Sequence, residues 1–166
     1  MARGGEARAA LLKCDPTEVM PPLIWLAEGH MDYVKAAAAL EVMRELPGAS
    51  AYLAELIRKA PPESSSYDLP TGMKMLVKMK TNESLRAVGE FLFNDANPPL
   101  ESQGGAPCVP LPSPVRMVAL YHLRQAKLEG APVSEAEIND EEVANYRKWW
   151  VEKYGKPEIT PSKQEH

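Results

Sequence analysis

The stretch of sequence that decides the fold is Asn97-Pro-Pro-Leu-Glu-Ser-Gln-Gly-Gly-Ala-Pro-Cys-Val-Pro-Leu-Pro-Ser-Pro114. Its prolines exclude a helix, because proline lacks the backbone N–H and clashes with the preceding turn, and Gly104-Gly105 loosens the backbone further. The sequences on both sides have helical patterns. A connection of this length without secondary structure is uncommon in a compact domain unless it is functional, disordered or laid along another surface. We therefore predict two helical blocks joined by an extended arm.

The block before the arm contains several helix signals. Asp15-Pro-Thr-Glu18 combines an Asp N-cap with Pro at the first helical position and Glu at the third, whereas Pro21-Pro22 either restarts or kinks that helix. Ser50 is the expected N-cap of a later helix, and Thr81 is the expected N-cap of another. The helices expected in this block cover residues 6–13, 15–27, 32–46, 51–60 and 82–93.

The helix over 32–46 follows from a run of alanines, which have the highest intrinsic helix propensity. Residues at helical spacing define the face that we expect to point inward. This apolar stripe consists of Tyr33, Ala36, Ala37, Leu40 and Met43.

The segment Met73-Lys-Met-Leu-Val-Lys-Met-Lys80 is ambiguous. The spacing of its lysines and apolar residues favours a helix, although a buried edge strand has a similar pattern. Its methionines either form an adaptable, basic binding surface with the lysines or fill gaps in the core with the lysines opposite in solvent, and we favour the core. The preceding segment 61–70 is a loop by composition.

After the arm, Ser113-Pro114 again combines an N-cap with a first-turn Pro and opens a helix that we expect to end at Glu129. Residues 134–137 form a capping box that opens a short turn. A second box, Asn139-Asp-Glu-Glu142, opens a helix to Tyr154, which Gly155 closes.

These elements predict an all-α fold, a small irregular bundle of about seven short helices with a long Pro/Gly-rich extended arm. A chain of 166 residues with 45% hydrophobic residues is sufficient for one core. We expect a single domain over 1–166 that comprises a helical block at 15–94, the arm at 95–112, C-terminal helices at 113–155 and a tail at 156–166.

Charge and cysteine content limit the classes of partner. The net charge of −4 lacks the basic footprint typical of nucleic-acid binding, and no apolar run approaches the roughly 20 residues of a membrane span. Cys14 and Cys108 lie far apart, which favours a reducing, intracellular compartment, either the cytoplasm or an organellar matrix. Arg3, Arg8 and Lys13 are typical of an organellar presequence, but Glu6 interrupts that pattern.

No pattern of catalytic or ligand-binding residues is present. His30, His122 and His166 lack further ligands at metal-binding spacing, and zinc needs at least three protein ligands. The chain has no G-x-S-x-G elbow, no phosphate-binding loop and no dinucleotide fingerprint. We therefore expect no cofactor, no metal, no small-molecule ligand and no catalytic residue.

The last helix has an aromatic face. Val143, Tyr146, Trp150 and Tyr154 recur at helical spacing, so this face either docks on the core of the protein or meets another molecule. Trp149 points about 100° away from Trp150 on the helical wheel. We expect Trp150 to lie in the core and Trp149 to contact a partner.

The interface that we predict has two parts. The prolines of the arm either form a polyproline II ligand for an aromatic groove or act as a stiff spacer. In the C-terminal segment, aromatic rings would bury large areas at low entropic cost, with lysines as a polar rim. The predicted contact residues are Pro107, Pro110, Pro112, Trp149, Lys153, Tyr154 and Lys156.

From these features we predict a non-catalytic accessory or structural subunit of a larger multiprotein assembly, whose partners are other protein subunits. One alternative is a helical adaptor or regulator that binds a partner transiently. Another is an enzyme with a site that its sequence motifs do not reveal. The sequence does not identify the partner.

Overall fold

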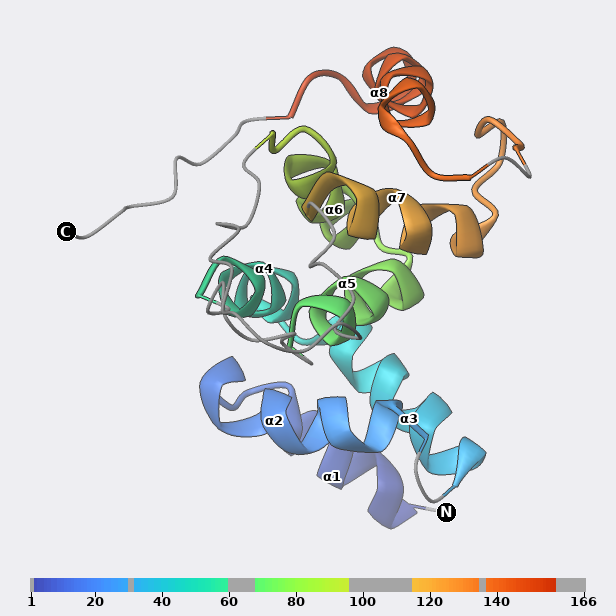
Figure 1. Ribbon diagram of the computed structural model, residues 1–166. Coiled ribbons are helices and arrows are strands. Elements are labelled where there is room, and N and C mark those ends of the chain that lie inside the picture. Colours follow the sequence, from blue (N-terminus) through green and yellow to red (C-terminus); the bar gives the residue numbers. More distant parts are fainter. Residues whose placement is uncertain (1, 30–31, 60–67, 96–114, 135–136, 158–166) are drawn as a thin grey trace, which may run out of the picture.

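The computed structural model describes residues 2–29, 32–59, 68–95, 115–134 and 137–157. These residues form eight helices without a strand, which confirms the all-α prediction (Figure 1). The helices are α1 (Ala2–Leu11), α2 (Pro16–Ala27), α3 (Tyr33–Glu45), α4 (Ala49–Lys59), α5 (Asp68–Met79), α6 (Asn82–Leu92), α7 (Val115–Ala126) and α8 (Asp140–Tyr154).

The arrangement has three levels. Helices α1, α2 and α3 lie at one end, α4 to α7 form the middle, and α8 lies at the opposite end (Figure 1). Helix α2 packs mainly against α3, and an ion pair of 2.6 Å between Arg8 and Glu45 links α1 to α3. In the described part of the chain, no helix is long and apolar enough to cross a membrane.

Four helices begin at side-chain N-caps, of which the sequence predicts Asp15, Thr81 and Asn139 as caps and Asp32 only as the start of its helix. The side chains of Asp15, Asp32, Thr81 and Asn139 each accept a hydrogen bond from a backbone N–H of the first turn. Helix α2 continues through Pro21-Pro22 without a restart. These caps satisfy donors that have no partner inside the helix, which is why their positions can be predicted locally.

Predicted boundaries of three helices are wrong. Helix α1 covers Ala2–Leu11 rather than residues 6–13, and it ends early because the Lys13 and Cys14 N–H groups donate to carbonyl oxygens three residues back, as in a turn. Helix α4 begins at Ala49, so Ser50 lies inside its first turn, where it is only 2% exposed, and it is not the N-cap. The start is earlier because Gly48 already accepts the hydrogen bond from the Tyr52 N–H, at 2.9 Å. Helix α7 ends at Ala126 because Lys127 adopts a left-handed backbone with φ of 48°, which a continuing helix does not allow.

Helix α5 is the centre of the fold. It packs against α4, α6 and α7, and a helix that is apolar on nearly all sides is typically buried in this way. The segment 73–80 is therefore helical up to Met79, and its methionines belong to the core. Its beginning corrects the predicted loop over 61–70, because Asp68 is already helical.

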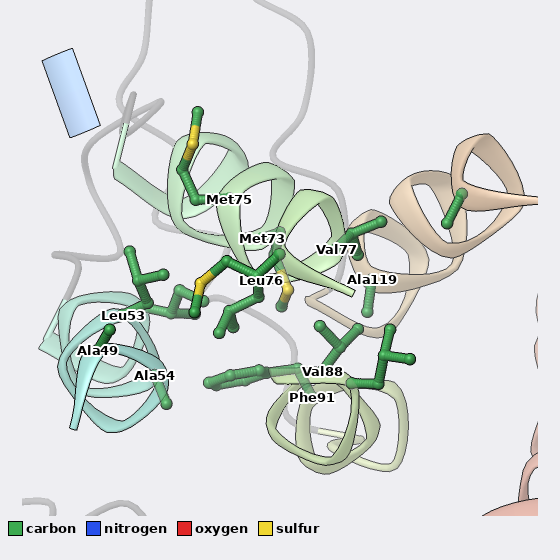
Figure 2. Close-up of a cluster of buried hydrophobic side chains, with 14 of the residues drawn as sticks. Ala49, Leu53, Ala54, Met73, Met75, Leu76, Val77, Val88, Phe91 and Ala119 are labelled. Atoms are coloured by element: carbon green, nitrogen blue, oxygen red, sulfur yellow. The ribbon is translucent and has the colours of Figure 1, made fainter. Parts of the chain in front are cut away.

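Figure 2 shows how the middle helices share this core. Leu53 of α4, Leu76 of α5 and Phe91 of α6 point into the same space, and Val88 faces Ala119 between α6 and α7. Burying side chains of this size stabilises the fold by about 1.5–3 kcal/mol each.

The predicted apolar stripe of α3 is wrong in part. Ala36 and Met43 are buried, but Tyr33 is 90% exposed and Ala37 is exposed as well, while Leu40 is half-buried. The buried face instead includes Ala39 and Val42. Because alanines occupy all sides of this helix, the sequence does not determine which side packs on the neighbouring helices.

Candidate functional site

Helix α8 docks on α6 and α7 through the aromatic face predicted from its spacing. Trp150 is 1% exposed and its indole lies directly against Gly89, where a Cβ atom would come within 2.6 Å of the Trp150 Nε1. Tyr146 is buried beside it, with its hydroxyl 3.5 Å from the Leu123 carbonyl oxygen. Burial, with a smaller contribution from Tyr154, raises the pKa of Tyr146 to about 12. The prediction that Trp150 belongs to the core is confirmed.

Trp149 is half-buried within its own molecule. Its ring makes edge-on contacts with Tyr146 and Tyr154, at centroid distances of 5.0 and 5.9 Å. The Lys153 ammonium group lies 5.3 Å from its centroid and donates a hydrogen bond to the Glu129 carbonyl oxygen. The connection between α7 and α8 thus crosses the side of α8 that holds Trp149, which covers part of the ring.

The structure brings three of the predicted contact residues together. Trp149, Lys153 and Tyr154 form one aromatic and basic cluster at the end of α8, and Lys156 is exposed shortly after it. The arm, with Pro107, Pro110 and Pro112, lies outside the described residues. Whether the cluster contacts a partner stays a prediction.

An open, polar hollow of about 360 Å³ lies beside the first turns of α8. Arg116 donates to one carboxylate oxygen of Asp140 through Nε and Nη2, at 3.0 and 2.8 Å. Arg147 donates to Asp95 at 2.6 Å and to the Leu92 carbonyl oxygen at 2.9 Å. Both guanidinium groups are thus occupied by contacts that join α6, α7 and α8. The hollow is lined by Asp95, Arg116, Asp140, Val143 and Arg147.

This hollow could not be predicted from the sequence, because its paired residues lie far apart in the chain. Arg116 and Asp140 belong to different helices, and Asp95 follows α6. Only the packing of the three helices brings them together.

A second surface missed by sequence reasoning is the outward side of α3. Tyr33 and Val34 are 90% and 77% exposed, and Ala37 and Ala38 are also exposed. We call these four residues the α3 face. On α2, Trp25 is half exposed at 51%. Single exposed apolar residues are common, whereas adjacent ones on one helix make a candidate contact surface.

A third surface is the one open side of α5 between residues 71 and 79. Lys74 and Lys78, one helical turn apart, are half-buried, whereas the other residues of this span are buried. His122 of α7 lies within electrostatic range of Lys74, because burial together with the positive charge of Lys74 lowers the pKa of His122. We call Lys74, Lys78 and His122 the lysine strip.

Among the residues with a described position, no three His, Cys, Asp or Glu side chains gather in a way that would hold a metal ion. Comparison of the chain with family models, curated proteins and solved structures finds no match. The candidate functional site is therefore defined only by the three surfaces and the hollow described above.

Proposed function

We propose that this protein is a non-catalytic accessory subunit of a larger multiprotein assembly and acts through protein–protein contacts. The observation that supports this most is the α3 face, on which Tyr33 and Val34 leave nearly their whole side chains in solvent. Burying one such side chain against a partner contributes about 1.5–3 kcal/mol before the costs of association are subtracted. Tyr is also among the residues that most often dominate binding energy at interfaces.

The cluster of Trp149, Lys153 and Tyr154 is the second contact that we propose, and the arm prolines and Lys156 stay among the proposed contact residues. Its aromatic rings are partly exposed, and its lysine lies at the edge, which is the arrangement of an anchor with a polar rim. We place the protein in a reducing compartment, because Cys14 is an exposed free thiol and such thiols are uncommon in oxidising compartments.

Isolation of the tagged full-length chain from cells that express it naturally tests this function. We expect a partner at fixed stoichiometry that remains bound at high salt, because apolar contacts are insensitive to screening. A partner that dissociates at moderate salt would instead support the transient adaptor. An isolated monomer under all conditions would contradict the proposal.

A matched pair of variants locates the contact. Val34→Ser removes an exposed apolar side chain from the α3 face, whereas Val133→Ser makes the same change in the α7–α8 connection, where Val133 is 96% exposed. We expect loss of partner only for Val34→Ser. Equal retention in both variants would exclude the α3 face as the contact.

A further inference from the structure

The lysine strip includes the open side of α5, a helix that is otherwise buried over residues 71–79. Helix α5 buries Met73, Met75 and Met79 and leaves only Lys74 and Lys78 partly open over residues 71–79. Residues four apart face the same side of a helix, with about 5–6 Å between their Cβ atoms. Helix α5 packs against α7, and the charge of Lys74 on α5 acts on His122 of α7.

These groups disfavour one another electrostatically. Burial and the charge of Lys74 both lower the pKa of Lys78 and of His122. Lys74 and Lys78 form no ion pair within the described part of the chain. Glu28 at the end of α2 acts on Lys78 with opposite sign, and its carboxylate accepts a hydrogen bond of 3.1 Å from Thr71. The influence of Glu28 on Lys78 is smaller than that of burial and that of Lys74.

We propose that the lysine strip binds a carboxylate-rich segment of a protein partner. This inference rests on the proposed function and adds the chemistry of the partner to it. Anionic groups placed on the strip would offset the repulsion between its three members. Two carboxylates fit the spacing of Lys74 and Lys78 when they stand two residues apart in an extended segment, since a strand advances about 3.3 Å per residue.

Charge complementarity favours an acidic peptide over nucleic acid. The whole chain carries 23 acidic against 19 basic side chains, so a long phosphate backbone would be repelled beyond the strip. A short carboxylate segment needs only the strip itself. Exposed charges more than about 8–10 Å away are largely screened at physiological salt, which limits the repulsion that such a segment experiences.

Binding should depend on pH through His122. Its neighbours are Lys74 on α5, which lowers the pKa of His122, and Tyr121 on α7, whose ring lies 5.1 Å from the imidazole. The lowered pKa of His122 favours its neutral form in the free protein. A bound carboxylate stabilises its protonated form, so the affinity for an acidic segment should increase as the pH falls below the ordinary His value of 6.5.

A fluorescent polyglutamate peptide tests the proposal by anisotropy on the full-length protein at low salt. We compare Lys74→Gln/Lys78→Gln with Lys127→Gln/Lys148→Gln, which removes the same charge from exposed lysines outside the strip. We expect the strip variant to weaken binding about tenfold, as loss of two charge contacts allows, and the control about twofold or less. Thermal unfolding by circular dichroism verifies that both variants fold.

The outcomes separate this inference from the proposed function. Absence of peptide binding, or equal losses of affinity in both variants, would overturn the proposal that the lysine strip binds an acidic segment. Isolation of an assembly would still support the proposal that the protein is a subunit. Tighter binding of a single-stranded DNA oligonucleotide than of the peptide would also overturn it. Peptide binding that depends on the strip, together with a chain isolated only as a monomer, would support the strip and contradict the subunit.

Discussion

Gly89→Ala tests how α8 is held on the rest of the fold. Gly89 lies in α6 where the Trp150 indole rests on the backbone, and an added Cβ would stand 2.6 Å from Nε1 and 2.7 Å from Cε2 and Cζ2. Favourable contacts between such atoms need about 3.5–4.0 Å. Because the ring is 1% exposed, it cannot withdraw without displacing α8.

The magnitude follows from two opposing effects. Alanine is favoured over glycine in a helix by about 1 kcal/mol. Forcing an extra carbon into a packed core costs about 1–3 kcal/mol. Since a rigid, enclosed ring leaves little room to relax, we expect a net loss of about 1–2 kcal/mol in the free energy of unfolding. Gly5→Ala in α1 is the control, because no atom lies within 4 Å of its added Cβ and it should be neutral or stabilising.

Urea unfolding followed by circular dichroism measures both variants. Combining Gly89→Ala with Trp150→Leu should recover stability relative to the sum of the single changes, with a coupling of about 1–3 kcal/mol. If Gly89→Ala is as stable as the unmodified protein, or if the two changes are simply additive, the packing of Trp150 on Gly89 is refuted.

Three further predictions follow from buried or half-buried groups. Ser50→Ala should raise the free energy of unfolding by about 1 kcal/mol, because the buried hydroxyl has no hydrogen-bond partner among the described residues; a loss in urea unfolding would show that it has one. Tyr146→Phe should stay folded to higher pH than the unmodified protein. The pKa of Tyr146 is about 12 in the folded state against an ordinary 10.0, so as the pH rises the unfolded chain loses this proton first and is thereby stabilised. The unmodified protein should therefore lose about 2 kcal/mol relative to the variant as the pH rises through that range, and identical pH profiles would contradict it. Trp150→Ala should destabilise by about 3–5 kcal/mol, whereas Trp149→Ala should unfold at higher urea than Trp150→Ala and weaken partner binding; if both unfold the protein, the aromatic cluster is entirely core.

The helix starts could be predicted from the sequence because they depend on local hydrogen bonds. Asp15 and Thr81 satisfy first-turn donors a few residues away, so their roles are visible without knowledge of the fold. Ser50 has the same preference, yet packing buried it inside α4 because the turn at Gly48 starts the helix earlier. A local preference of about 1 kcal/mol gives way to tertiary packing of larger magnitude.

The distinction between Trp149 and Trp150 followed from the helical wheel, but the degree of burial of Trp149 did not. Its ring is covered by the chain that precedes α8, and Lys153 reaches back to Glu129. This contact depends on the path of the loop between α7 and α8, and a loop has no repeating sequence pattern from which its path could be predicted.

The surfaces that support the proposals were not predictable for the same reason. The alanines of α3 are apolar on every side, so only the packing against neighbouring helices shows that Tyr33 points outward. His122 is far from Lys74 in sequence, and only the packing of α7 on α5 brings them together.

The most direct test of the central claim is the mass of the species isolated with the tagged full-length chain at high salt, measured by light scattering after size exclusion. We predict a single species heavier than the 18.3 kDa chain, with the partner in fixed ratio. A monodisperse species at 18.3 kDa would contradict the claim that this protein is a subunit of an assembly.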